Sequence, residues 1–446
     1  MNRVSFFALS LALMILAVSR GLYADQTDLK AKVAGETGAL VEIYKQLHAN
    51  PELSYFEEQT SARLAAELEK AGYEVTRPVG KYPQHIDHKC WGVVGMLKNG
   101  DGPVVMVRGD MDALPIVENT GLDYASKVTM LDHGGAQPLG VMHACGHDVH
   151  TTVLLGTARM LAQLKDQWQG TVIIVGQTAE ERGGGARALI ADGLYQRWPV
   201  PDYAVAEHVD PTMDAGQVGY CPGWAMANVD MMDITIRGIG AHGARPHQGI
   251  DPVVISAHVI TALQSIVSRN INPIDDGVVT VGSIHGGSKH NIIPDEVKLQ
   301  LTIRSYKEDV RRTMIEAIER ITVNTARAFG VPEDRLPIVN GGVEFTPALY
   351  NDPDLTMKSV KAIGAQLGED KLVELPPTTG GEDFSEYGRT AEKVPVFMMR
   401  LGTAEPGIAK QGRPGLHSAL FYPLPEPTIQ TGVVAMTAAV MNLLGK

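Results

Sequence analysis

The sequence has few cysteines and no block of basic residues. Three cysteines occur among 446 residues, an odd number, so a dense disulfide framework is excluded, and Cys90 and Cys221 could pair or stay free. The formal net charge is −12, and no run of Lys or Arg marks a nucleic-acid-binding face. No internal repeat or low-complexity tract stands out. The composition is that of an ordinary globular protein, and no nucleic-acid partner is expected.

Two further features are missing: a phosphate-binding loop and a long membrane span. Gly183-Gly184-Gly185 lacks the Lys-Ser/Thr of a P-loop, so we expect it to let the backbone approach a site. The apolar run from Val4 to Val18 is shorter than the roughly 20 residues that span a bilayer. With Leu22-Tyr23-Ala24 behind it, the run resembles a secretory signal over residues 1–24, although an uncleaved anchor is the alternative. We therefore predict an exported protein, periplasmic or secreted, with no stable membrane span after signal removal.

Metal-binding side chains are concentrated in one short segment. His143, Cys145, His147 and His150 fall within eight residues, at the start of a predicted helix. A thiolate and an imidazole two residues apart can both bind one divalent ion. The alternative is that Cys145 is a small buried apolar residue and the histidines are polar residues at a helix start. Potential ligands elsewhere in the chain favour the metal site.

Those further ligands follow predicted buried strands. Three short apolar runs each lead into acidic or histidine side chains: 103–108 into Asp110 and Asp112, 170–176 into Glu180 and Glu181, and 203–206 into His208. Taken singly, a Glu pair is usually solvated, an Asp forms turns and a lone His is a satisfied polar residue. Ligand sites in open α/β sheets gather at the carboxyl ends of strands, so together these groups predict one site.

Six motifs in the same order resemble one known family. They are Arg108-Gly-Asp-Met-Asp-Ala-Leu-Pro115, His143-Ala-Cys-Gly-His-Asp148, Thr178-Ala-Glu-Glu181, Gly240-Ala-His242, Gly380-Gly-Glu-Asp-Phe384 and Leu416-His-Ser418. The chain resembles the aminoacylase and carboxypeptidase family of two-metal hydrolases, in its branch of hippurate hydrolases and auxin (indole-3-acetyl) amino acid conjugate hydrolases. The resemblance runs from about Val41 to the C-terminus.

The resemblance implies a role for each ligand. Cys145 would bridge two metal ions, His147 and His208 would complete one, and Glu181 and His417 the other. Glu180, not bound to metal, would be the general base that takes a proton from the activated water and returns it to the leaving amine. Asp112 would orient ligands. Relatives outside this branch have a ligand His where this chain has Asp110, so His147 would replace it, and for His150 a structural role stays open.

The metal itself is not specified by these ligands. Zinc or manganese is expected, and cobalt or nickel is also compatible with thiolate, imidazole and carboxylate donors. In the lid of the resembled family, the positions of His242, Asn291 and Arg304 imply substrate contacts, with Arg suited to a carboxylate. For Arg304, a salt bridge at the rim of the site is the alternative.

Length and pattern predict two domains in an α/β fold. We expect a metal-binding catalytic domain over 25–225 and 346–446, with a mainly parallel sheet flanked by helices. Between them, residues 226–345 show the β-α-β-β-α-β order of an inserted ferredoxin-like α+β unit. The resemblance implies that this insertion is a lid that also forms a homodimer.

The predicted function is a metal-dependent amidohydrolase that cleaves N-acyl or N-aroyl amino acids. The alternatives are a metallo-carboxypeptidase or dipeptidase, a cysteine-nucleophile amidase using Cys145 and His147, and a non-catalytic periplasmic binding protein on the same scaffold. A binding protein needs no base beside the ligand Glu181, so the presence of Glu180 argues for an enzyme.

Overall fold

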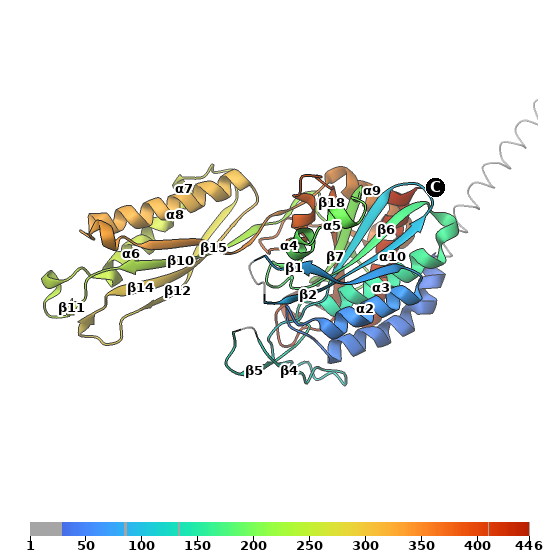
Figure 1. Ribbon diagram of the computed structural model, residues 1–446, viewed down its shortest axis with the longest axis horizontal. Coiled ribbons are helices and arrows are strands. Elements are labelled where there is room, and N and C mark those ends of the chain that lie inside the picture. Colours follow the sequence, from blue (N-terminus) through green and yellow to red (C-terminus); the bar gives the residue numbers. More distant parts are fainter. Residues whose placement is uncertain (1–28, 84–86, 133, 409, 446) are drawn as a thin grey trace, which may run out of the picture. The chain divides into compact units, whose positions relative to one another are not determined.

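The computed structural model describes residues 29–83, 87–132, 134–408 and 410–445, which form two compact units (Figure 1). Unit 1 holds the described residues up to Gly223, Asn351–Leu375 and the chain from Glu386 onward. Unit 2 holds Trp224–Tyr350 and Pro376–Ser385. The predicted signal peptide, 1–24, lies outside the described residues. That residues 226–345 act as lid and dimerisation domain stays a prediction.

Unit 1 is built on an eight-stranded sheet with the order β1-β2-β6-β3-β7-β18-β8-β17. Its strands are β1 (Glu74–Lys81), β2 (Lys89–Asn99), β3 (Val104–Asp110), β6 (Gly170–Gln177), β7 (Tyr203–Asp214), β8 (Val218–Tyr220), β17 (Leu372–Glu374) and β18 (Val396–Ala404). The neighbours β6, β3, β7 and β18 are parallel, whereas β1, β2 and β8 join the sheet by antiparallel pairings. Every residue of β6 is buried, as a strand covered on both faces requires.

Helices cover both faces of this sheet (Figure 1). They are a helix over residues 29–49, α2 (Glu58–Lys70), α3 (His147–Gln163), α4 (Gly185–Ala191), α5 (Leu194–Arg197), α9 (Pro353–Leu367) and α10 (Pro425–Leu444). On β2, Gly95 faces Leu68 of α2 and Gly92 faces Leu189 of α4. Since residues three apart on a strand point to opposite faces, α2 and α4 lie on opposite sides of the sheet. α3 packs against α2 and α10 on the α2 side, over the main core.

The order in which the chain adds parallel strands to the sheet reverses beside β3. From β3 the chain passes through α3 to β6 on one side, and from β6 through α4 and α5 to β7 on the other. This is a topological switch point, where the carboxyl ends of strands open into a crevice. The strands predicted at 103–108 and 170–176 are present as β3 and β6. The short strand predicted at 203–206 was wrong in length: β7 continues to Asp214 because β18 pairs with it, so His208 lies inside a strand.

Unit 2 is an antiparallel four-stranded sheet with helices on one face. The strand order is β12-β14-β10-β15, and the elements are β10 (Asn228–Arg237), α6 (Pro252–Leu263), α7 (Ser265–Arg269), β12 (Gly277–Gly286), β14 (Glu296–Ser305), α8 (Glu308–Ala328) and β15 (Ile338–Thr346). Alternate residues of β14, such as Leu299 and Leu301, pack under α6 and α8. The chain order is β-α-β-β-α-β, and the predicted fold class, α/β with an inserted α+β unit, is confirmed.

Short elements complete the two units. They are β4 (Thr129–Leu131), β5 (Pro138–Gly140), β9 (Gly223–Met226), β11 (Ala241–His242), β13 (Ile292–Ile293), β16 (Leu349–Asn351) and six 3-10 turns: Lys165–Gln167, Pro246–Gln248, Glu333–Arg335, Glu369–Lys371, Asp383–Gly388 and Lys410–Gly412. Among the described residues, two helical stretches, Pro252–Arg269 and Pro425–Leu444, are long and apolar enough to cross a membrane by length and composition. The second is mostly buried, as a core helix of a folded domain is.

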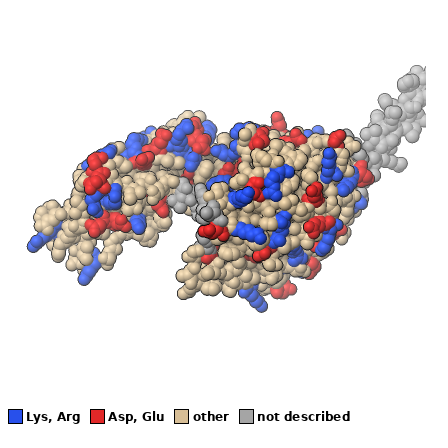
Figure 2. Space-filling model, in the orientation of Figure 1, with Lys and Arg blue, Asp and Glu red and all other residues tan. Residues whose placement is uncertain are grey.

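Charges of both signs are mixed on the surface. Figure 2 shows Lys and Arg interspersed with Asp and Glu on the face in view. The excess of acidic residues is therefore not gathered into one block on that face.

Candidate metal centre

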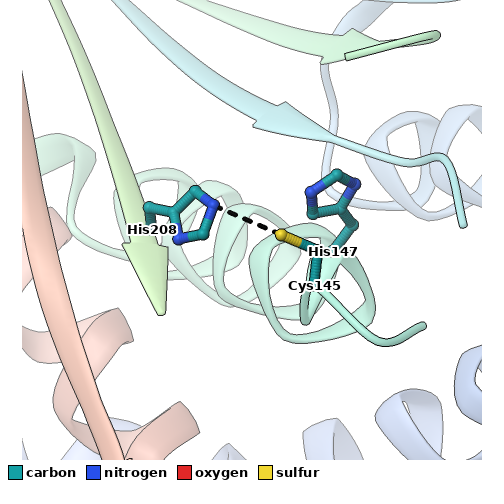
Figure 3. A group of neighbouring side chains, drawn as sticks. All are labelled: Cys145, His147 and His208. Carbon is teal, nitrogen blue, oxygen red and sulfur yellow. Dashed lines mark hydrogen bonds between the residues drawn. The ribbon is translucent and has the colours of Figure 1, made fainter. Parts of the chain in front are cut away.

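Cys145 and His147 are placed by a sharp turn at the start of α3. Gly146 between them has φ +79, and a Cβ there would lie 2.6 Å from Val209 Cγ2, so both conformation and space require glycine. Figure 3 shows Cys145 and His147 beside His208, which comes from β7. Cys145 Sγ lies 3.6 Å from His208 Nε2. Possible ligand atoms of these three buried residues lie within 4.8 Å of one another, which is the spacing of a metal site.

A second group shares Cys145. It adds Glu181, which follows β6, and His417, whose backbone N–H donates to Ala144 O at 2.9 Å. His417 Nε2 lies 3.4 Å from Glu181 Oε1, and His417 adopts a left-handed φ of 60. Such strain in a non-glycine residue is held only where surroundings fix it, often at functional sites. The His417 side chain is 54% exposed, so the cluster is buried on the His147 side and open on this one.

Hydrogen bonds orient both buried histidine rings. His147 Nδ1–H donates to Asp112 Oδ1 at 3.2 Å, and His208 Nδ1–H donates to Val209 O at 2.8 Å. In each ring this leaves Nε2 toward the cluster with a lone pair to offer a cation. Within the described chain, His147 Nε2 and Glu181 Oε1 are buried without a hydrogen-bond partner. Orphaned buried polar atoms of this kind are what a bound cation satisfies.

Burial and neighbouring charges set the protonation of the three buried ligand-type residues. Burial, and then the charge of Glu181, raises the pKa of the Cys145 thiol well above its usual range. Burial lowers the pKa of His208, which keeps the imidazole neutral. Burial also opposes the charge of His147, but Asp110 and Asp112 outweigh it and raise the pKa of that ring. A metal ion would therefore displace protons from Cys145 and His147 on binding.

Glu180 lies at the same cluster without belonging to either shared-cysteine group. Its Oε2 is 3.9 Å from His147 Nε2, and Glu181 Oε1 lies at the same distance from that nitrogen. Both glutamate side chains are 11% exposed. The predicted ligands Cys145, His147, Glu181, His208 and His417 and the predicted base Glu180 are thus brought together. Their donor types fit a pair of borderline divalent ions.

The other two histidines of the segment, His143 and His150, are not among the predicted ligands. His150 Nδ1 shares a 2.6 Å hydrogen bond with Asp110 Oδ1, and its Nε2 accepts from Val209 N–H at 2.9 Å. Both ring nitrogens of His150 are therefore used by the protein, which supports its structural role. His143 is in none of the candidate ligand groups of the described residues, and burial lowers its pKa to about 4.

A buried polar layer beneath the cluster escaped the sequence analysis. Arg108 Nη1 donates to Asp110 Oδ2 at 2.7 Å, and Arg108 Nε donates to Gln177 Oε1 at 2.9 Å. Ser54 Oγ donates to Asp112 Oδ2 at 2.7 Å. One signal was available: an arginine at the end of a buried apolar strand needs a buried partner.

The predicted substrate residues all lie in unit 2. His242 on β11 and Asn291 before β13 are exposed and adjacent, because Gly243 N–H donates to Asn291 O at 2.8 Å. Arg304 lies apart from them on β14, half-buried, and its Nη1 donates to Ile303 O at 3.1 Å. Their substrate contacts stay predictions.

The three cysteines are free thiols. Cys90 and Cys145 are buried and Cys221 is half-buried. Cys90 and Cys221, whose pairing the sequence left open, are therefore not joined, and Cys145 is available for a metal.

Comparisons with known proteins show the family of this chain. Residues 106–442 match the profile of Peptidase family M20/M25/M40. The chain belongs to this family. The six motifs that carried the resemblance fall within the matched range, and so do all the predicted ligands named above.

Relatives of this chain include a deacetylase, an amino acid conjugate hydrolase and a carboxypeptidase. The chain is 36% identical to N-acetyl-L-cysteine deacetylase of Bacillus subtilis (82% of this chain, 80% of the relative), and 36% identical to IAA-amino acid hydrolase ILR1-like 4 of Arabidopsis thaliana (78% and 74%). It is 35% identical to thermostable carboxypeptidase 2 of Saccharolobus solfataricus (82% and 86%). A solved dinuclear metal binding peptidase of the M20 family from Bacillus subtilis is 29% identical, with a TM-score of 0.71 over 91% of this chain and 98% of that one. The specific hippurate or auxin-conjugate branch stays a prediction.

Proposed function

We propose that this family member is an exported amidohydrolase that uses two divalent metal ions to release amino acids from N-acyl or N-aroyl conjugates. The observation that carries the proposal is the cluster of five ligand-type side chains around Cys145, with Glu180 beside it. Relatives that deacetylate N-acetyl-L-cysteine and hydrolyse IAA-amino acids support the substrate class. The apolar N-terminal segment supports export.

The chain's own residues supply the binding site and the proton transfers. Cys145, His147 and His208 would hold one ion, and Cys145, Glu181 and His417 the other. When bound, such ions lower the pKa of a water and polarise an amide carbonyl. Glu180 would take the proton from that water and deliver it to the departing amine, because it lies 3.9 Å from His147 Nε2 and belongs to neither group that shares Cys145.

Unit 2 would contribute substrate recognition and the subunit contact. His242 and Asn291 would contact the substrate, and Arg304 would hold its carboxylate by a bidentate pair. β12 is an edge strand of the unit 2 sheet, with Val278 and Ile284 exposed, which supports a homodimer formed through this unit.

A metallo-carboxypeptidase or dipeptidase is the second candidate. It is favoured by the 35% identity to thermostable carboxypeptidase 2 of Saccharolobus solfataricus. Both reactions use the same metals and base, so only the substrate distinguishes them.

The test is amino acid release by the purified chain lacking residues 1–24. Hippurate, N-acetyl amino acids and dipeptides are assayed before chelation, after it and after metal add-back. We expect hydrolysis of N-acyl amino acids that chelation abolishes and add-back restores. Preference for dipeptides would favour the second candidate, whereas activity that survives chelation would refute the metal mechanism.

A variant pair tests the base. Glu180→Gln should keep two metals per chain and lose roughly 100-fold or more of turnover, because an amide cannot accept the proton. Glu42→Gln is the control, since Glu42 is 64% exposed on the first helix. Unchanged turnover in Glu180→Gln would refute the assignment of Glu180 as the general base.

A further inference from the structure

The turn that presents Glu180 is tight and strained. Ala179 has a φ of 48, in the left-handed region that residues with a Cβ rarely adopt. The N–H groups of Gly184 and Gly185 fold back onto Ala179 O at 3.1 and 3.2 Å. A Cβ on Gly185 would lie 1.5 Å from Thr178 O, so the turn closes without room for a side chain there. Such a conformation persists only where contacts from outside fix it.

Two buried carboxylates hold the peptide groups on either side of Glu180. Glu57 Oε1 accepts the Ala179 N–H at 2.7 Å, and Asp112 Oδ2 accepts the Glu181 N–H at 3.0 Å. Glu57 is 0% exposed and Asp112 is 1% exposed. The backbone is therefore held just before and just after Glu180 by two side chains that burial itself keeps in place.

Helix capping does not account for Glu57. It occupies the N-cap position of α2, but its side chain makes no capping hydrogen bond. Its second oxygen, Oε2, is buried with no partner in the described part of the chain. Burial, and then the charge of Asp112, raises the pKa of this carboxyl well above its usual range. A buried acid placed beside another acid destabilises the fold, so its position calls for a role outside stability.

We propose that Glu57 is a positioning residue for the general base: by holding the Ala179 amide, it fixes the direction from which the Glu180 carboxylate enters the metal cluster. This inference rests on the proposed function of Glu180. It explains why a strained alanine is tolerated one residue before the base. It also assigns a function to the segment before α2, which contributes no predicted ligand.

Three variants and one control test it. Glu57→Met keeps most of the side-chain length but removes the acceptor. Glu57→Gln keeps an acceptor oxygen at the same reach. Glu57→Asp keeps the carboxyl group but is one methylene too short, and it is used in place of Glu57→Met if the Met variant does not fold. Glu58→Met is the control, because Glu58 is the exposed neighbour on the same helix start.

The kinetic result separates positioning from general damage. We expect Glu57→Met, or Glu57→Asp, to lower kcat about 10- to 100-fold with two metals still bound and KM within about threefold of wild type. Glu57→Gln should recover kcat to within about threefold of wild type. Wild-type kcat in the Met or Asp variant, or a fall in kcat that only follows metal loss, would overturn the proposal.

Amide hydrogen exchange gives a readout that needs no substrate. Exchange in the peptide covering residues 178–185 should be faster in Glu57→Met than in wild type and Glu57→Gln. Unchanged exchange in the Met variant would overturn the role of Glu57 even if the wild-type chain is an active hydrolase. If wild type hydrolyses no substrate with metal added, the proposed function fails, and the exchange result still decides whether Glu57 holds the turn.

Discussion

A buried histidine that is not among the predicted ligands gives a quantitative prediction of pH dependence. His48, on the first helix, lies 2.7 Å from Asp148 Oδ2 through Nδ1 and 3.1 Å from Glu118 Oε1 through Nε2. Burial alone lowers the pKa of this ring, but the hydrogen bonds to Asp148 and Glu118 outweigh burial and raise the pKa to about 9. His48 is therefore a buried cation between two carboxylates at neutral pH.

The magnitude follows from the difference between the folded and unfolded pKa. A value of about 9 in the folded chain, against 6.5 in the unfolded one, corresponds to at most about 3 kcal/mol of unfolding free energy. Because the folded pKa is the higher one, this contribution is complete below pH 6.5. It declines as pH rises toward 9 and is absent above that.

Denaturant unfolding of wild type and His48→Gln at pH 6, 7.5 and 9.5 measures the contribution of His48 to the unfolding free energy. Tryptophan fluorescence reports mainly on unit 1, which contains Trp91, Trp168 and Trp198. We expect the stability difference between the two proteins to shrink by up to about 3 kcal/mol from pH 6 to 9.5. The control His247→Gln changes an exposed ring in unit 2. A difference that stays constant, or grows with pH, would refute the reasoning.

Three further predictions concern metal and packing. Asp112→Ala should weaken metal binding about 10- to 100-fold, because His147 loses the acceptor that orients its ring. A competition titration with a chromophoric chelator measures this affinity, and an unchanged value would contradict the prediction. Chelation should lower Tm, since ions present at 100 times Kd stabilise the fold by about 2.7 kcal/mol per site, and an unchanged melting curve would argue against bound metal. Gly156→Ala in α3 should destabilise by about 1–3 kcal/mol in denaturant titrations, because its Cβ would lie 2.4 Å from Val433 Cγ2. The control Gly38→Ala, on an open helix surface, should stabilise the fold by about 0.5–1 kcal/mol. Equal effects of the two substitutions would show that the contact with Val433 does not determine the cost at Gly156.

Sequence patterns predicted those parts of the fold that depend on neighbours along the chain. β3 and β6 follow from continuous apolar runs, and the order of elements in unit 2 follows from alternating and helical periodicity. β7 was predicted too short because its second half pairs with β18 (Val396–Ala404), which lies nearly two hundred residues later in the sequence. No local pattern contains that pairing.

The same limit applies to the candidate site. The ligand-type residues stand in recognisable motifs, so they could be proposed from the sequence. Glu57 and His48 could not, because their partners Ala179 and Asp148 are 122 and 100 residues away. What they do depends on which backbone amide or carboxylate the fold brings to them, and a single glutamate or histidine at the end of a helix gives no sign of it.

The spread of the ligand-type residues along the chain has a consequence for biosynthesis. The sheet of unit 2 is complete once residue 346 has been made, whereas β18, which fills the middle of the unit 1 sheet, and His417 come later. During translation the unit 2 sheet therefore has all four of its strands before the unit 1 sheet has all of its own. A chain interrupted between these points would have a complete unit 2 sheet and an incomplete unit 1 sheet. On the proposed assignment, the full set of ligands for two metal ions exists only when the polypeptide is nearly complete.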